Sequence, residues 1–252
     1  MSLPAAWLRP ADLPPEVGAA MSTRDGGVSA GAWTSLNLGA AVGDDARAVT
    51  ENRARFAQAL GALPVFLDQV HGTRVVRVDR AAAERTEAPP RADASLTTEP
   101  GVACTVLVAD CLPVLLAAPA GRGVAAAHAG WRGLAGGVVE AALHALCEAA
   151  ACQPDEVSAW LGACIGPRRF EVGADVVQAF GATPGRFVER PGIAGKWLAD
   201  LPGLARDRLR AAGVRRVSGG DWCTVEERSR FFSFRRDVVT GRMAAAIWLR
   251  AR

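Results

Sequence analysis

Three side chains that can bind a metal ion stand where short apolar segments of the chain end. Cys111 follows Val102–Val108, and His128 follows Val124–Ala127 directly before a glycine-containing turn. His71 follows the predicted strand Pro64–Val70 and precedes a glycine. Short apolar segments bounded by glycine and proline are typical of buried strands, so we expect the three side chains to meet at one rim of a sheet.

Two imidazoles and one thiolate suit zinc, with bonds of roughly 2.0–2.3 Å. Three protein ligands leave a fourth position for water or substrate, as in catalytic zinc sites. The three residues share no short motif, so their spacing leaves other interpretations open. They are either unrelated polar residues at strand ends, or Cys111 is a metal-free thiolate nucleophile with His128 as its base.

Copper is the other metal that this ligand set permits, because a blue-copper centre uses two histidines and a cysteine. The chain contains three histidines, and the remaining one, His144, lies at the flank of a predicted helix. A multicopper cluster needs more imidazoles than one further histidine supplies. The histidine count therefore excludes a multicopper laccase within this chain.

Arginines form a second group of candidate residues. Arg24 and Arg53 lie in the first third of the chain, and Arg235 and Arg236 follow an apolar segment near its end. Guanidinium groups match phosphate geometry, and each charge-assisted hydrogen bond contributes about 1.5–3 kcal/mol. The alternative is that they are ordinary surface arginines. Neither GxGxxG nor GxxxxGK[ST] occurs, so no standard nucleotide-binding loop is predicted.

Composition limits the partners. The 29 basic and 26 acidic residues are spread along the chain and give a net charge of +3, which does not favour nucleic-acid binding. The apolar stretches are too short to span a membrane, and the N-terminus lacks the pattern of a signal peptide. The six cysteines show no CxxC pairing, so we expect free thiols and a cytoplasmic protein. The oligomeric state is left open.

The hydrophobic pattern predicts one α/β domain with mixed strands over residues 17–252, after an irregular lead-in over residues 1–16. Helices are expected from Asp44 or Asp45 to Leu60 and at Leu134–Ala150, Ala174–Phe180 and Ala199–Ala212. Besides the segments that precede the three metal-binding candidates, strands are expected at Thr73–Asp79, Val114–Ala118, Val157–Leu161, Val214–Ser218, Phe231–Phe234 and Met243–Leu249. Residues 81–91 are expected to be a surface connection.

Several longer segments share a resemblance. The segments MSTRDGGVSAGAWTSLNLG, VGDDARAVTENRARF, DQVHG, VLVADCLPVLL, AAAHAGWRG, LGACIGPRRFEVG and FFSFRRDVVTGRMAAAIWL, in this order, resemble the laccase-domain or "multicopper polyphenol oxidoreductase" family, typified by YfiH-like proteins. The resemblance runs from about Met21 to Leu249. It implies an α-β-β-α fold with mixed sheets, related to cysteine hydrolases, and zinc held by His71, Cys111 and His128.

The resemblance also implies an activity. It points to phosphorolysis of adenosine, inosine, guanosine and methylthioadenosine by phosphate, together with adenosine deaminase activity. Copper-dependent polyphenol oxidation is the older family label. Some members are instead described as cytoplasmic peptidoglycan-editing amidases, for which Cys111 and His128 would be the nucleophile and base. A zinc-stabilised structural module is the non-enzymatic alternative.

Our hypothesis from the sequence is a zinc-dependent purine nucleoside phosphorylase with deaminase side activity. Cys111, His128 and Arg236 are its predicted catalytic residues. Arg236 and Arg24 are expected to hold phosphate, Asn37 to contact the sugar or base, and Arg53 to bind substrate.

The sequence departs from the family at three places. It has GPRRFEVG where relatives often have GPCCYEVG, and FFSFRRD where they have YFSYRRD. Paired cysteines and tyrosines are therefore predicted not to be essential. A histidine common in the loop after SLNLG is replaced by Ala41, which removes that imidazole from the loop.

Overall fold

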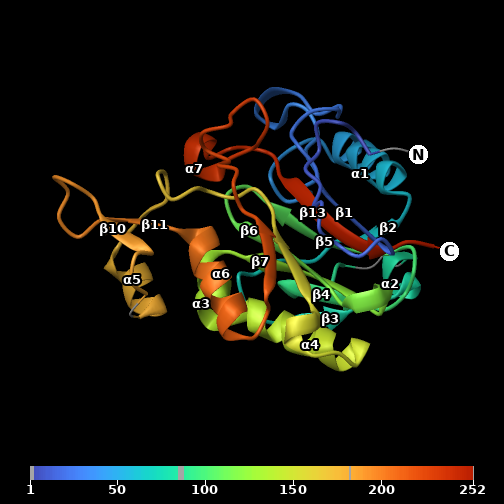
Figure 1. Ribbon diagram of the computed structural model, residues 1–252. Helices are drawn as coiled ribbons and strands as arrows, with labels where there is room; N and C mark the ends of the chain where they lie inside the picture. The colour runs from blue at the N-terminus through green and yellow to red at the C-terminus, as the bar shows by residue number, and fades with distance from the viewer. Residues whose placement is uncertain (1–2, 85–87, 182, 252) are drawn as a thin grey trace.

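The computed structural model describes residues 3–84, 88–181 and 183–251. Within these residues, two sheets pack face to face, and helices cover the outer face of each (Figure 1). The expected α-β-β-α layering with mixed sheets is therefore confirmed.

The first sheet has the strand order β1-β13-β5-β2. Its strands are β1 (Val17–Met21), β2 (Leu63–Val65), β5 (Val102–Val108) and β13 (Met243–Leu249). Helix α1 (Ala46–Leu60) packs its buried Phe56 against the outer face of this sheet. The Asp45 side chain caps its first turn by accepting a hydrogen bond from the Ala48 amide, as the sequence predicts.

The second sheet has the order β12-β8-β6-β7-β4-β3 and runs through the middle of the molecule. Its strands are β3 (Val75–Arg77), β4 (Ala94–Thr97), β6 (Leu112–Ala117), β7 (Val124–Ala129), β8 (Ser158–Leu161) and β12 (Arg216–Gly219). Helices α3 (Trp131–Gly136), α4 (Val138–Ala150) and α6 (Leu201–Ala211) cover its outer face.

Strand β6 is apolar on both sides because it lies between two cores. Val114 and Leu116 face the helices, while Leu115 and Ala117 face the first sheet. A strand buried on both faces has no polar alternation, which explains the continuous apolar run in the sequence.

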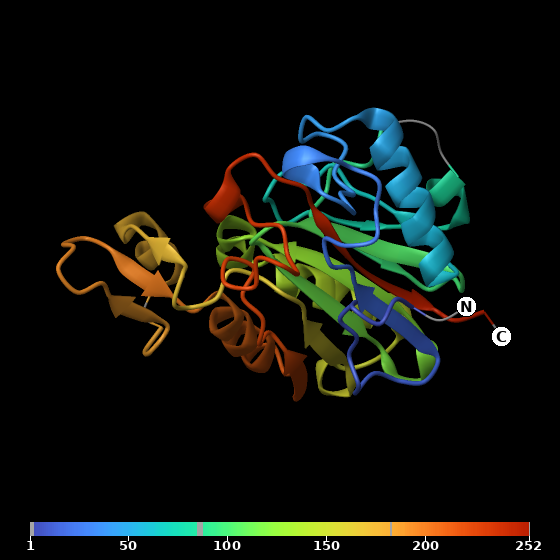
Figure 2. The same cartoon turned by 90° about the horizontal axis from the view of Figure 1, so that it is seen from above.

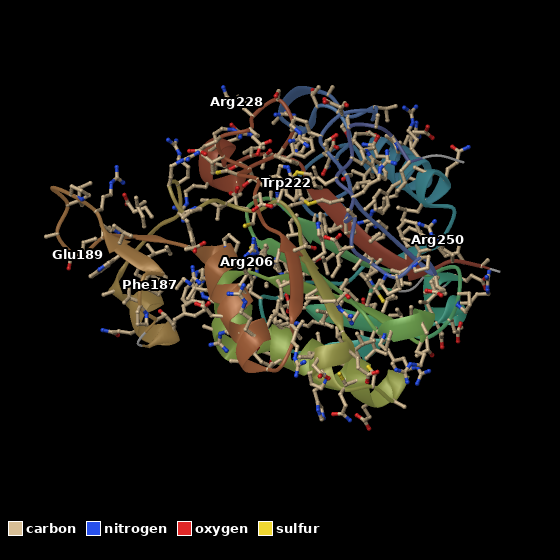
Figure 3. All side chains as sticks on the ribbon, viewed as in Figure 1. Phe187, Glu189, Arg206, Trp222, Arg228 and Arg250 are labelled. Carbon is tan, nitrogen blue, oxygen red and sulfur yellow. The ribbon has the colours of Figure 1, made fainter. Side chains whose placement is uncertain are left out.

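A small lobe stands apart from the layers (Figure 2). It contains β9 (Glu171–Val172), α5 (Ala174–Phe180), β10 (Phe187–Glu189) and β11 (Trp197–Ala199). Phe187 and Glu189 lie on its outlying strand, away from the two large sheets (Figure 3). Strands β10 and β11 were not predicted, because each is only three residues long.

Several expected elements differ in detail. The predicted helix Leu134–Ala150 is two helices, because Gly137 adopts a left-handed conformation with φ of 97°. The predicted strand Phe231–Phe234 is wrong. Phe231 and Phe232 are buried in an irregular segment, and the short helix α7 (Phe234–Asp237) begins where the strand should end.

Other differences concern short elements. Of the predicted strand ending at Val70, only β2 is extended, and the chain then continues without regular structure to β3. Strands β1 and β4 were not predicted, and α2 (Arg80–Glu84) overlaps the start of the predicted connection, whose residues 85–87 lie outside the described residues. The remaining short helices are 3-10 turns: η1 (Gly31–Trp33), η2 (Pro119–Gly121) and η3 (Pro154–Glu156).

The predicted lead-in contains no helix or strand within residues 3–16, but it is anchored. Trp7 and Leu8 are buried, and Leu8 forms an isolated bridge with Met21 of β1. The division into a lead-in and a single domain stays a prediction. No helix in the described part of the chain is long and apolar enough to cross a membrane.

Candidate active site

The structure brings His71, Cys111 and His128 together. One ligand atom from each residue lies within 4.8 Å of the other two. Cys111 Sγ is 3.7 Å from His71 Nε2, and the two imidazole rings meet edge to face with centroids 4.8 Å apart. His128 is buried, Cys111 is partly buried and His71 is exposed. The group is therefore open to a ligand on one side.

The three residues come from three parts of the second sheet. His128 is next to last in β7, and Cys111 directly precedes β6, its antiparallel neighbour. His71 lies in a turn before β3 with a positive φ of 61°. Asp110 also has a positive φ, of 98°, and its carboxylate accepts hydrogen bonds from Thr224 Oγ1 and the Arg235 amide, both at 2.6 Å. These bonds hold the backbone next to Cys111.

Asp93 joins two of the three metal-binding candidates. Its buried carboxylate accepts backbone hydrogen bonds from residues 70–72, at 3.2, 2.8 and 2.7 Å, and a fourth from His128 Nδ1 at 2.9 Å. With Nδ1 bound to Asp93, the Nε2 atom of His128 is left to face Cys111 and His71. Sequence reasoning missed Asp93, whose only signal is a single acid before the unpredicted strand β4.

The pKa of Asp93 reflects these contacts. Burial alone raises the pKa of the carboxyl, but the hydrogen bonds from His128, Gly72 and His71 and the charge of His128 outweigh burial, and the pKa is lowered. An ionised carboxylate behind a metal-binding imidazole raises the basicity of that ligand.

Cys111 and His128 shift each other's pKa in opposite directions. Burial alone raises the pKa of the Cys111 thiol, but the charge and hydrogen bond of His128, with a further bond from His71, lower it to about 6. Burial lowers the pKa of His128, but Cys111 and Asp93 raise it to about 9. A thiolate at neutral pH can bind a cation or act as a nucleophile.

Gly130, in the loop between β7 and α3, makes room for this group. A Cβ atom at this position would lie 2.8 Å from His71 Cδ2 and 3.0 Å from Cys111 Sγ. Both distances are shorter than van der Waals contact. The glycine that follows His128 and Ala129 is therefore required for the close approach of the ligands.

A cavity of about 760 Å³ opens over the three residues. This volume is typical of a small-molecule site. Most of the lining side chains are apolar, and the polar part consists of the candidate ligands with Asp68, Gln69 and two arginines. The lining residues are Gly39, Ala40, Ala41, Val42, Arg53, Phe66, Leu67, Asp68, Gln69, His71, Ala88, Pro89, Leu107, Val108, Ala109, Cys111, His128, Phe234 and Arg242.

Of the predicted substrate residues, Arg53 lines the cavity. Its guanidinium lies over the Phe66 ring, 4.0 Å from the centroid, and its Nε donates to the Leu38 carbonyl at 2.9 Å. Arg242 lines the same cavity and was not among the predicted residues. Arg242 directly precedes the apolar strand β13, and nothing else in the sequence around it indicates a functional role.

The other three predicted residues lie outside the lining. Arg236 donates to Asp237 and to three backbone carbonyls, so each of its guanidinium nitrogens already has a partner. Asn37 is buried and bonds to Asp44 and the surrounding backbone. Arg24 donates to two backbone carbonyls and lies over a phenylalanine ring. All three brace loops near the cavity, and a direct contact with substrate stays a prediction for each.

A family model described as multi-copper polyphenol oxidoreductase laccase matches residues 18–250. The chain belongs to this family. A Pseudomonas aeruginosa protein described as a purine nucleoside phosphorylase is 49% identical over 249 residues, covering 97% of this chain and 98% of its own. Escherichia coli YfiH, also described as a purine nucleoside phosphorylase, is 48% identical over 242 residues, covering 94% and 95% of the two chains.

Solved structures of similar proteins support the fold. A crystal structure of a Neisseria meningitidis protein has a TM-score of 0.89 and 48% identity, covering 98% of this chain and all of its own. YlmD from Geobacillus stearothermophilus has a TM-score of 0.89 and 34% identity, with 97% and 96% of the two chains covered. The laccase label of the family does not decide which metal the His-Cys-His group prefers.

We predict that the purified protein holds about one zinc ion per chain. The variants His71→Ala, Cys111→Ala and His128→Ala should each lose most of the zinc, since each removes one of three ligands. His144→Ala, on α4, is the matched control and should retain it. Elemental analysis after gel filtration measures the metal content, and full retention in two of the three variants would refute the site.

Asp93→Asn should weaken zinc binding by about tenfold or more, because an amide cannot accept all the hydrogen bonds that the carboxylate accepts. The lowered pKa of Asp93 means that its ionised form stabilises the fold above the ordinary aspartate pKa. That stability is lost as the pH falls through the lowered value. The free energy of unfolding of the variant should therefore depend less on pH in this acidic range, and Asp155→Asn, on the surface, serves as control.

Gly130→Ala should also lower zinc affinity by about tenfold or more, because its methyl group displaces His71 or Cys111. Gly136→Ala is the control, since its Cβ would approach only the Thr73 methyl group, at 3.0 Å. Competition with a chromophoric chelator measures both affinities. Equal affinities in the two variants would show that the close approach at residue 130 is unimportant.

Proposed function

We propose that this protein is a metal-dependent purine nucleoside phosphorylase. The observation that carries the proposal is a His-Cys-His group open to a cavity of about 760 Å³ with largely apolar walls. Such a cavity suits a purine nucleoside, which has a flat aromatic base and a polar sugar. Relatives at 48–49% identity that are described as purine nucleoside phosphorylases support the same conclusion.

Zinc is the metal we propose for the group formed by His71, Cys111 and His128. Two imidazole nitrogens and one thiolate match its preferred ligands, and the Asp93 bond presents the Nε2 atom of His128. When bound there, zinc would supply Lewis-acid chemistry. Copper fits the same donors, but a multicopper oxidase would require further imidazoles, and His144 is the only other histidine of the chain.

In phosphorolysis an oxygen of phosphate forms a bond to the ribose C1′ while the bond from C1′ to the purine nitrogen breaks. The electron pair of that bond leaves with the purine, which overall takes up the proton that phosphate loses. Phe234 offers an exposed ring against which the base can pack, and Leu107 and Val108 add apolar side chains to the walls of the cavity. Adenosine, inosine, guanosine and methylthioadenosine share the parts of the molecule that these residues contact.

Adenosine deaminase activity is the second reaction that we propose for the same site. Water replaces the amino group at C6 of the purine, and ammonia leaves. The substrate is the same nucleoside, so a cavity that binds it for phosphorolysis also binds it for hydrolysis at the base. We place both reactions in the cytoplasm, because the six cysteines are free thiols.

A second candidate function is an amidase that uses Cys111 as nucleophile and His128 as base. The lowered pKa of Cys111, about 6, and its contact with an imidazolium favour it. In that reaction the thiolate would attack the carbonyl carbon of a peptidoglycan precursor, and the amine would leave with a proton from His128. Water would then hydrolyse the thioester, which releases the acid and restores the thiolate. A metal at the same sulfur excludes this chemistry, so the two candidates are experimentally separable.

Alkylation of Cys111 by iodoacetamide should separate them. We expect the zinc-loaded protein to resist alkylation and to convert inosine and phosphate to hypoxanthine and ribose 1-phosphate. Removal of zinc by a chelator should abolish turnover and make Cys111 the fastest cysteine to react. Its alkylation rate should reach half its maximum at a pH near the pKa of the thiol, about 6. Burial raises the pKa of Cys104 and Cys147 to about 12, so these thiols provide the internal control.

Mass spectrometry of the modified peptides gives the alkylation rate of each cysteine, and a muropeptide substrate is assayed in parallel. Rapid alkylation of the zinc-loaded protein, with muropeptide cleavage that survives the chelator, would overturn the phosphorylase proposal in favour of the amidase.

A further inference from the structure

We infer that Arg53 and Arg242 together form an anion subsite in the cavity and that its ligand is inorganic phosphate. The inference deepens the proposed function, on which the identity of the anion rests. Among the residues that the structure describes, neither arginine contacts a carboxylate, and both line the cavity that contains the His-Cys-His group.

Arg53 presents an incompletely bonded guanidinium to the cavity. Its Nε donates to the Leu38 carbonyl at 2.9 Å, and its plane is supported by the Phe66 ring. Its two terminal nitrogens have no hydrogen-bond partner among the residues that the structure describes. Burial lowers the pKa of Arg53. The Nε edge of the Arg53 guanidinium is thus fixed by Leu38, while its terminal nitrogens remain available to donate hydrogen bonds.

The guanidinium of Arg242 is also incompletely bonded. Its Nη1 donates to the carbonyls of Thr240 and Gly241 at 3.1 and 3.0 Å, which leaves Nε and Nη2 without a partner in the described part of the chain. Burial lowers the pKa of Arg242, although the charges of Cys111 and Asp110 oppose this shift. These charges act on it because Arg242 lies near the candidate metal centre.

The segment of residues 37–39 contacts both arginines. The Leu38 carbonyl accepts from Arg53 Nε, and the Leu38 amide donates to the Arg242 carbonyl at 3.0 Å. Asn37 Oδ1 accepts from the Arg242 amide at 2.8 Å. Gly39 packs against the Arg242 stem so closely that a Cβ there would lie 2.7 Å from Arg242 Cγ. The positions of the two guanidinium groups are therefore linked through the backbone.

Two partly buried cations without counter-ions are costly unless a ligand neutralises them. Among the described residues, no carboxylate oxygen lies within 4.0 Å of either guanidinium, whereas Arg186 is bound by both Asp200 and Asp207. The unused nitrogens are not sealed in the protein, since none is among the buried unpaired atoms of the described residues. They are open to an anion that enters the cavity.

Phosphate is the anion that this arrangement fits best. Guanidinium forks bind tetrahedral oxyanions with two parallel hydrogen bonds, and the remaining oxygens of the phosphate stay free to attack. The phosphoryl group of a nucleotide would offer the same chemistry. We assign free phosphate because the proposed reaction consumes it as a second substrate.

The test is binding of inorganic phosphate to the zinc-loaded protein by isothermal titration calorimetry, without turnover. Arg53→Gln and Arg242→Gln should each weaken binding by about tenfold or more. Arg55→Gln is the matched control, since Arg55 lies on the same helix, is exposed and pairs with Glu51, and its phosphate affinity should equal that of the wild type. Zinc content and melting temperature establish that each variant is folded.

Steady-state kinetics with inosine give the second readout. The KM for phosphate should rise by about tenfold or more in both glutamine variants, with a much smaller change in the KM for inosine. Arg53→Lys and Arg242→Lys keep the charge but lose the fork, so they should recover part of the affinity. If a glutamine variant does not fold, the lysine variant is measured in its place, and it should still bind phosphate more weakly than the wild type.

The outcomes separate the subsite from the proposed function. Phosphate binding that depends on both arginines supports the subsite even if inosine is not cleaved. Inosine phosphorolysis with an unchanged KM for phosphate in both variants overturns the subsite and leaves the phosphorylase standing. Arginine-dependent binding of inosine 5′-monophosphate, with no binding of free phosphate by the wild type, would assign the pair to a nucleotide and also overturn the inference.

Discussion

A single buried carboxylate, that of Asp93, organises the candidate metal centre. It gathers the amides of the turn that carries His71 and also binds His128 Nδ1, so it positions two candidate ligands at once. The backbone reinforces this, since the His128 amide donates to the Asp93 carbonyl at 2.7 Å. An unpaired carboxylate would be costly at this depth, so the fold and the site require each other. The register of β6 against β7 then places Cys111 beside the two histidines.

That register depends on the packing of the two sheets. Strands β6 and β7 are buried on both sides, by helices on one and by the first sheet on the other. A shift by one residue would exchange the residues that face the two cores, and it would also move Cys111 away from His128. The same close packing makes Gly130 necessary, because a larger residue would occupy the space of the ligands.

The arginines near the cavity fall into two kinds that the chain alone does not distinguish. Arg24 and Arg236 use their guanidinium groups on backbone carbonyls or on Asp237, so they stabilise the loops that surround the site. Arg53 and Arg242 keep donors open to the cavity and have no carboxylate within ion-pair distance among the described residues. The difference between the two pairs is position, because Arg53 and Arg242 line the cavity from which a mobile anion would approach, whereas Arg24 and Arg236 lie outside its lining.

The residue pattern by itself determined the α/β class with mixed strands, the long helices and strands with clear periodicity, and the three residues that can bind a metal, because these depend on local pattern and residue type. The α-β-β-α layering was implied by the family resemblance. The residue pattern did not determine strands β1, β4, β9, β10 and β11 or the buried position of Phe231 and Phe232, which follow from contacts distant in sequence. Asp93 could not be recognised for the same reason: its partners include His128, 35 residues away. Only the tertiary structure decided which arginine donors remain unused, because hydrogen-bond acceptors are supplied by the folded backbone around them.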